Sequence, residues 1–170
     1  MMYARWTRTL LITITLFVGV ASVIQTASAE SSLTRIAERY FRGVYGCNPT
    51  VIEELASPDI VVSYPVFVSL YGKPTLRGRD AVTAFAKHFC QKWANPEVVF
   101  NDAVSDERRV FLLWSFRARD TEAETGNAES NWGGITLIRF DVDGKITAEI
   151  GEESVPGPMG RLADIVGKEP

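Results

Sequence analysis

Histidine and cysteine are scarce in this chain of 170 residues, which leaves few side chains for metal chemistry. His88 is the single histidine, and Cys47 and Cys90 are the only cysteines. No cysteine or carboxylate repeats at a spacing that would complete a tetrahedral zinc set around His88. The chain after residue 29 also lacks a glycine-rich phosphate loop and a haem-attachment motif. The sequence therefore predicts no metal, nucleotide, flavin or haem cofactor.

Basic residues are outnumbered, with 18 Lys and Arg against 21 Asp and Glu. Arginines occur as short pairs such as Arg77/Arg79 and Arg108/Arg109, interleaved with acidic residues, and they form no basic stripe. A protein that neutralises nucleic-acid phosphates needs such a stripe. We therefore expect no nucleic-acid partner.

No apolar run reaches the roughly 20 residues that span a bilayer. The run 10–24 follows Arg5 and Arg8 and precedes the small residues Ala27-Ser28-Ala29, an order typical of a secretory signal peptide. We expect residues 1–29 to be removed near Ala29, with an uncleaved anchor as the alternative. The mature chain 30–170 then carries 16 basic and 21 acidic residues and forms a single domain, secreted or periplasmic, without stable membrane insertion.

The two cysteines fit an oxidising compartment, where a disulfide persists. Cys47 and Cys90 are a candidate disulfide pair. The alternative is two buried free thiols, because free cysteine packs well in protein cores.

Apolar residues with helical spacing dominate the first half of the mature chain. Steps of three and four predict a helix over 33–44, and Asn48-Pro49 opens a short second helix that ends before Pro58. A third helix begins at Gly78-Arg79-Asp80 and ends at Asn95-Pro96, with His88 off its apolar stripe. That stripe comprises Val82, Phe85, Ala86, Phe89 and Trp93.

Strand patterns follow the helical ones. Residues 60–64 are β-branched or aromatic and predict a strand, whereas 66–75 fits no single pattern. From residue 98 the sequence predicts four consecutive strands, and Asp143-Gly144 joins the last two in a tight turn. Helices followed by an antiparallel meander predict an α+β fold. The four strands are expected at 98–103, 109–119, 131–141 and 145–153.

Three stretches resemble the nuclear transport factor 2-like superfamily, specifically its SnoaL-like and ketosteroid-isomerase-like members. They are 38–41, 76–82 and 139–146, and the resemblance extends over 33–154. It implies a cone-like, curved antiparallel sheet covered by N-terminal helices. It also implies a mostly apolar pocket on the concave side of the sheet and a homodimer formed through the outer face.

One position of the ketosteroid-isomerase catalytic set is retained. The resemblance implies that Tyr40 is the tyrosine that donates a hydrogen bond to the oxyanion. Tyr64 stands where those enzymes carry an aspartate base before a proline, and a tyrosine with a pKa near 10 is a poor base at neutral pH. Thr136 replaces the second oxyanion-hole acid. The isomerase set is therefore not retained, and the question of enzymatic activity stays open.

A ligand pocket is nevertheless expected, with aromatic walls and a few hydroxyl groups that suit a flat apolar molecule. For each residue the alternative is an ordinary place in the core. The candidate ligand-binding residues are Tyr40, Tyr64, Phe67, Trp114, Phe116, Trp132 and Thr136.

The last strand carries the remaining candidates for catalysis, Glu149 and Glu153, with Tyr40 as their partner. The resemblance implies that both glutamates face inward, where burial would raise the carboxyl pKa and allow acid or base chemistry. The alternating apolar residues Ile146, Ala148 and Ile150 would normally occupy the inside, which favours the glutamates in solvent.

Three functions remain open. The first is an exported module that binds a small apolar molecule without chemistry. The second is an isomerase, cyclase or dehydratase that uses Glu149 or Glu153 with Tyr40 and Tyr64. The third is a non-catalytic dimerisation module whose cavity is filled.

Overall fold

The computed structural model describes residues 32–123 and 128–167. The expected signal peptide, residues 1–29 with its cleavage site near Ala29, lies outside the described residues. Within the two described ranges, no helix is long and apolar enough to cross a bilayer.

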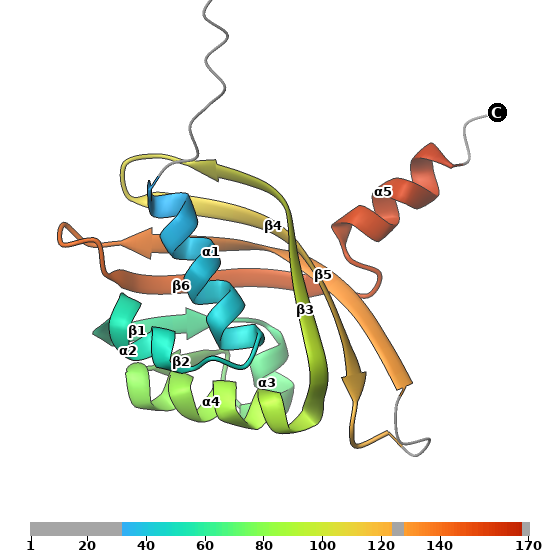
Figure 1. Ribbon diagram of the computed structural model, residues 1–170, viewed down its shortest axis with the longest axis horizontal. Coiled ribbons are helices and arrows are strands. Elements are labelled where there is room, and N and C mark those ends of the chain that lie inside the picture. The colour runs from blue at the N-terminus through green and yellow to red at the C-terminus, as the bar shows by residue number, and fades with distance from the viewer. Residues whose placement is uncertain (1–31, 124–127, 168–170) are drawn as a thin grey trace, which may run out of the picture.

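Helices and strands follow each other in an order close to the predicted one (Figure 1). The elements are α1 (Ser32–Tyr45), α2 (Thr50–Leu55), β1 (Ala56–Ser63), α3 (Val66–Tyr71), β2 (Thr75–Arg77), α4 (Arg79–Lys92), β3 (Trp93–Ser105), β4 (Arg109–Asp120), β5 (Ala128–Phe140), β6 (Ile146–Ser154) and α5 (Pro158–Val166).

The strands form one curved, open sheet in the order β2-β1-β6-β5-β4-β3. Strands β3 to β6 pair antiparallel with their chain neighbours, which confirms the predicted meander. Strand β1 pairs with β6 in parallel, a long-range pairing that local patterns do not reveal. The predicted α+β class with a curved sheet is confirmed.

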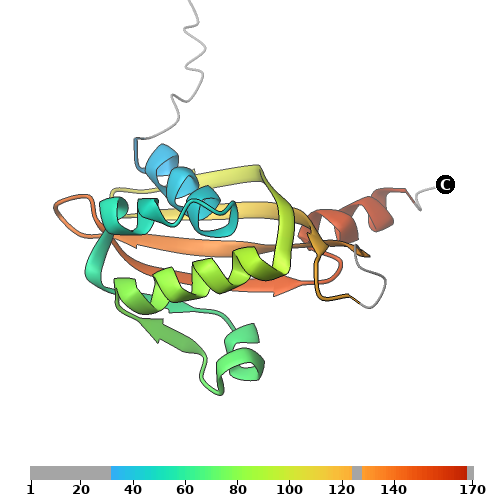
Figure 2. The same ribbon diagram turned by 60° about the horizontal axis from the view of Figure 1, so that its bottom comes forward.

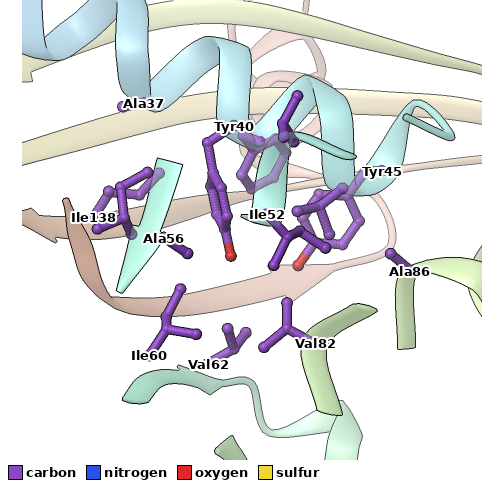
Figure 3. Close-up of a cluster of buried hydrophobic side chains, with 14 of the residues drawn as sticks. Ala37, Tyr40, Tyr45, Ile52, Ala56, Ile60, Val62, Val82, Ala86 and Ile138 are labelled. Carbon is purple, nitrogen blue, oxygen red and sulfur yellow. The ribbon is translucent and has the colours of Figure 1, made fainter. Parts of the chain in front are cut away.

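Helices α1, α2 and α4 cover one face of the sheet (Figures 1 and 2). The predicted stripe of α1 is buried at Ala37, Tyr40, Phe41 and Val44. Figure 3 shows Tyr40 and Tyr45 pointing from α1 into the cluster between helices and sheet. The core therefore lies on the side of the sheet that the resemblance implied.

Two prolines lie inside strands where the sequence predicted boundaries. Helix α4 ends at Lys92, and β3 starts at Trp93 instead of residue 98. Pro96 lies within a register shift between Ala94 and Glu97. Because β3 is an edge strand, the missing N–H of this proline does not remove a hydrogen bond from the centre of the sheet. Pro58 likewise lies in β1 at a register shift against β6.

The turn before β6 is longer than the predicted Asp143-Gly144 pair. It runs from Asp141 to Lys145, and Gly144 has a φ of 76°. One carboxylate oxygen of Asp141 accepts the backbone N–H groups of Asp143 and Lys145, at 2.9 and 2.8 Å. The predicted turn position is correct, and the aspartate organises it.

Candidate functional site

The face that β6 turns toward the core differs from the one that apolar alternation favours. Glu149 is completely buried, whereas Ile150 is 48% exposed. The pairing of β6 with β5 changes register at Thr147: Ile146 lies opposite Phe140, and Ala148 lies opposite Arg139. Thr147 has no partner of its own in β5 and is an extra residue in β6. One extra residue reverses the side-chain alternation beyond it. The expectation that Glu149 lies in solvent is therefore wrong.

A hydrogen-bonded chain of side chains satisfies one oxygen of Glu149. Its Oε1 accepts the hydroxyl protons of Tyr45 and Tyr64, at 2.9 and 2.7 Å. Because Tyr64 has one proton to give, it accepts from Thr136 at 2.8 Å, and Thr136 accepts the indole N–H of Trp114 at 2.9 Å. Elements α1, β4, β5 and β6 and the residue after β1 thus meet at one carboxylate.

The other oxygen, Glu149 Oε2, has no hydrogen-bond partner within the described residues, and neither has the hydroxyl of Tyr40. Burial raises the pKa of Glu149, and the hydroxyls of Tyr64, Tyr45 and Tyr40 around it offset part of the rise. Burial raises the pKa of Tyr40 as well, and the nearby Glu149 charge adds to this rise. Tyr40 and Glu149 thus lie close together in a site that disfavours charge.

Glycines let aromatic rings lie directly on the strands next to this network. A Cβ atom at Gly151 would come within 2.2 Å of the Tyr64 ring, and one at Gly134 within 2.7 Å of Trp114. Side chains at these two positions would displace the rings that hold Thr136 and Glu149. The small residues are therefore part of the site's geometry.

A cavity of about 640 Å³ opens between α3, α4 and the ends of β5 and β6. Its lining residues are Tyr45, Tyr64, Val66, Phe67, Leu70, Phe85, Phe89, Lys92, Trp93, Glu129, Ser130, Asn131, Trp132, Glu153 and Val155.

The structure divides the candidate residues into two groups. Tyr64, Phe67, Trp132 and Glu153 line the cavity. The remaining candidates are buried behind its wall: Tyr40, Trp114, Phe116, Thr136 and Glu149.

Sequence reasoning missed four aromatic wall residues, Tyr45, Phe85, Phe89 and Trp93. Phe85, Phe89 and Trp93 belong to the predicted third-helix stripe, which indicates burial but cannot separate a core contact from a cavity wall. Tyr45 follows the predicted end of the first helix. The structure extends α1 to include it and aims its hydroxyl at Glu149.

Glu153 is the one half-buried carboxyl group on the wall among the described residues. Burial raises the pKa of Glu153, and the neighbouring Trp132 indole N–H offsets part of the rise. The two lie close because Glu153 pairs with Gly134 across β5 and β6, two residues from Trp132. A carboxyl group in this setting can donate or accept a proton, or balance a positive charge.

Comparison with known proteins identifies the family. Residues 37–149 match the family model of the SnoaL-like domain, which covers most of the chain. The chain belongs to the SnoaL-like domain family. No curated protein matches the sequence significantly.

Solved structures share the fold of this SnoaL-like domain at low sequence identity. An NTF2-like protein of unknown function from Burkholderia pseudomallei is 16% identical, with 79% of this chain and 96% of that chain covered and a TM-score of 0.61. A proposed SnoaL-like polyketide cyclase from Jannaschia sp. CCS1 is 14% identical, with 85% and 97% covered and a TM-score of 0.61. SalBIII, an epoxide hydrolase/cyclase-like enzyme of pyran ring formation in the polyether salinomycin, is 14% identical, with 72% and 90% covered and a TM-score of 0.58.

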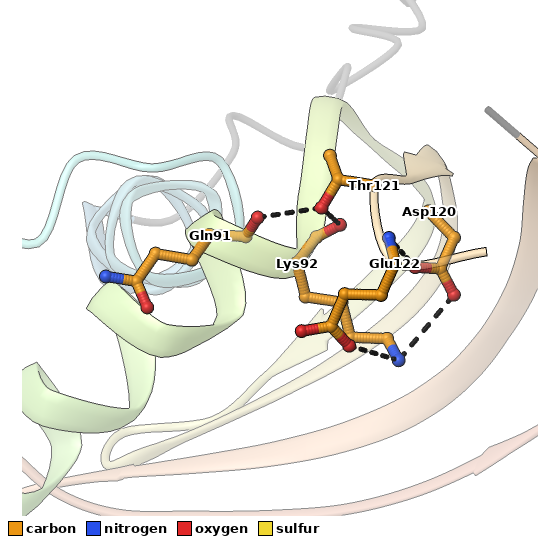
Figure 4. Close-up of polar contacts among 5 residues, drawn as sticks. All are labelled: Gln91, Lys92, Asp120, Thr121 and Glu122. Atoms are coloured by element: carbon orange, nitrogen blue, oxygen red, sulfur yellow. Dashed lines mark hydrogen bonds and ion pairs between the residues drawn. The ribbon is translucent and has the colours of Figure 1, made fainter. Parts of the chain in front are cut away.

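The cavity rim of this SnoaL-like domain is fixed where α4 meets the end of β4 (Figure 4). The ammonium group of Lys92 lies 3.6 Å from Asp120 and 3.3 Å from Glu122. The Thr121 hydroxyl lies 2.9 Å from the carbonyl oxygens of both Gln91 and Lys92 and donates to them. Lys92 is therefore paired with acidic side chains that lie outside the cavity wall.

The candidate pair Cys47 and Cys90 is joined in a disulfide, with Cα atoms 5.5 Å apart. It connects the segment between α1 and α2 to the end of α4. Since Tyr45, Phe85 and Phe89 lie near its two ends in the sequence, the bond holds two walls of the cavity together.

Metal ligation finds no support in the described part of the chain. His88 is exposed on α4, as the helical stripe predicted. No three side chains of His, Cys, Asp or Glu within residues 32–123 and 128–167 are placed to hold an ion.

Proposed function

We propose that this SnoaL-like domain binds a small, flat, apolar or aromatic molecule in the cavity between α3, α4 and the ends of β5 and β6. The observation that carries the proposal is the cavity wall, which combines seven aromatic side chains with one half-buried carboxyl group. A volume of about 640 Å³ is typical of cavities that hold a drug-sized ligand. Aromatic faces provide large apolar contact areas, and Ser130, Asn131 and Glu153 provide a few polar contacts.

Acid–base catalysis on the bound molecule is the second candidate function. It is favoured by the position of Glu153 on the cavity wall and by the raised pKa of its carboxyl group. The cyclase-like neighbours share the fold of this domain, and their chemistry is consistent with this candidate. Glu149 and Tyr40 lie behind Tyr45 and Tyr64, so of the two candidate glutamates Glu153 is the one that a bound molecule would touch.

A domain with a filled interior, expected for a module that only dimerises, does not fit the open cavity. Export remains a prediction from the leader sequence. Mass spectrometry of the protein recovered from its host tests it, with Glu30 expected as the first residue. An intact N-terminus at Met1 would contradict cleavage.

Titration calorimetry with 2-naphthol, a neutral flat aromatic probe, tests binding in the cavity. Leu70 lines the cavity from α3 and is exposed, so Leu70→Glu should leave the core intact and place a charge on the wall. We expect about tenfold weaker binding, because docking would desolvate that charge.

Leu162→Glu is the matched control, since Leu162 is an exposed leucine on α5 and is not part of the cavity wall. Its affinity for 2-naphthol should equal that of the unmodified protein. Equal affinities for all three proteins, or no binding at all, would contradict the proposed site.

A further inference from the structure

The charged groups on the cavity wall indicate which class of ligand the cavity binds. An inference drawn from these charges rests on the proposed function, since it concerns the same cavity. Glu153 reaches the cavity from β6 among aromatic residues. Within residues 32–123 and 128–167, no Lys, Arg or His side chain forms an ion pair with it.

The other charged groups on the wall already have partners. Lys92 lies between Asp120 and Glu122, at 3.6 and 3.3 Å. Glu129 lies 3.7 Å from Arg117. Among the described residues, Glu153 is therefore the wall charge left without a counter-ion, and Glu149 adds a second carboxyl group behind the wall.

The aromatic rings form a continuous wall around this carboxyl group. Ring centroids lie 5.5 Å apart for Tyr64–Phe67, 5.1 Å for Phe67–Phe85, 5.8 Å for Phe85–Phe89, 6.3 Å for Phe89–Trp93 and 4.9 Å for Trp93–Trp132. Trp132 ends the series beside Glu153, because Gly134, two residues along β5, pairs with Glu153. Aromatic faces attract cations, most strongly where water is excluded.

We propose that the cavity binds a molecule with an alkylated ammonium group, which pairs with Glu153 and packs its alkyl groups against Trp132 and the neighbouring rings. A cation with few N–H groups suits this wall, because aromatic faces offer no strong acceptors for a primary ammonium. Burying the Glu153 carboxylate alone is costly, and a ligand cation beside it offsets that cost. The remaining aromatic surface contacts the apolar body of the ligand.

Two probes of the same shape separate charge from apolar contact. Phenyltrimethylammonium and tert-butylbenzene differ by a positively charged nitrogen in place of a carbon. Titration of the purified protein at pH 8, followed by tryptophan fluorescence, measures the affinity for each probe. We expect the cation to bind about tenfold more tightly or better, as a desolvated cation–π contact with a carboxylate partner allows.

Glu153→Gln keeps the shape of the wall and removes its charge. We expect its affinity for phenyltrimethylammonium to fall about tenfold, to the level of tert-butylbenzene, while the affinity for tert-butylbenzene stays within about twofold. Glu129→Gln is the matched control, because Glu129 is an exposed acid on the same wall that already pairs with Arg117. It should change neither affinity by more than about twofold. An equal loss in Glu129→Gln would overturn the assignment to Glu153.

The results with these probes also separate this inference from the proposed function. Equal or tighter binding of tert-butylbenzene by the unmodified protein would overturn the preference for a cation and would still support an apolar ligand site. Failure of both probes and of 2-naphthol to bind would overturn both proposals. The comparison of probes on the unmodified protein does not depend on the folding of any variant.

Discussion

The carboxyl group of Glu149 is completely buried, and its contribution to the free energy of unfolding therefore depends on pH. The burial that raises its pKa makes the folded protein hold this proton more tightly than the unfolded chain does. Between the ordinary value of 4.5 and the raised value, the folded state therefore binds more protons. The contribution of Glu149 to stability is present at low pH and is lost as pH rises through this window.

Glu149→Gln tests the direction of this pH dependence, because glutamine keeps the acceptor oxygen for Tyr45 and Tyr64 and does not titrate. We expect the free energy of unfolding of the unmodified protein, relative to the variant, to fall as pH rises from 4 to 8. Each factor of ten by which folding tightens proton binding contributes about 1.4 kcal/mol to this fall. Urea unfolding across this pH range measures it.

Glu152→Gln is the control, since Glu152 is exposed on the opposite face of β6. Its difference from the unmodified protein should stay within about 0.5 kcal/mol at every pH. Parallel pH profiles for the Glu149 variant and the unmodified protein would show that the carboxyl group is not held in its neutral form by burial.

At the scale of elements, the Cys47–Cys90 disulfide joins the turn after α1 to the end of α4, and its two cysteines are 43 residues apart in sequence. The chain-entropy account of cross-links predicts a stabilisation of about 4 kcal/mol for a closed loop of this length. Its effect should centre on α1 and α4, which hold the Tyr45, Phe85 and Phe89 walls of the cavity.

Cys47→Ser combined with Cys90→Ser should lower the free energy of unfolding by about 2–4 kcal/mol, because the unfolded chain regains the freedom that the bond removes. Urea unfolding with and without reductant measures the loss. Reductant should lower the stability of the unmodified protein and leave the double variant unchanged. Equal stability of oxidised and reduced protein would contradict a structural role for the bond.

The secondary-structure elements themselves were largely predictable. Helical spacing located α1 and α4, and alternation located the four strands of the meander, because these patterns depend on neighbours in the chain. The predicted strand boundaries were less accurate near Pro58 and Pro96, where a register shift accommodates a proline inside the strand. Such shifts depend on the partner strand, which local sequence does not specify.

At the scale of the whole molecule, the outer face of the sheet carries a row of apolar side chains. Val104, Phe111, Leu137 and Ile150 are neighbours in the register of β3, β4, β5 and β6. Val104, Phe111 and Ile150 are 64%, 42% and 48% exposed. A contiguous exposed apolar surface is typical of a protein interface. We propose that a second copy of this chain covers it, in line with the homodimer that the resemblance implies.

Sedimentation equilibrium should therefore find a dimer, and Phe111→Glu should shift it to monomer, because each copy would bury an unpaired charge in the interface. Val142→Glu is the control, since Val142 is 74% exposed in the turn before β6 and lies outside the row. It should remain dimeric. A monomeric unmodified protein at about 100 μM would contradict the interface, a concentration well above the dissociation constant of a standard-size contact.

The sequence by itself determined the class of fold, the family and the order of α1, α2, β1, α4 and the four meander strands, because these follow from periodicity and short motifs. It did not reveal α3, β2 or α5. It did supply the aromatic residues and glutamates of the site. Only the tertiary structure decided which of them meet. One extra residue at Thr147 reversed the faces of β6, buried Glu149 and left Ile150 exposed. The cavity that separates α3 and α4 from the ends of β5 and β6 has Glu153, rather than Tyr40, on its wall.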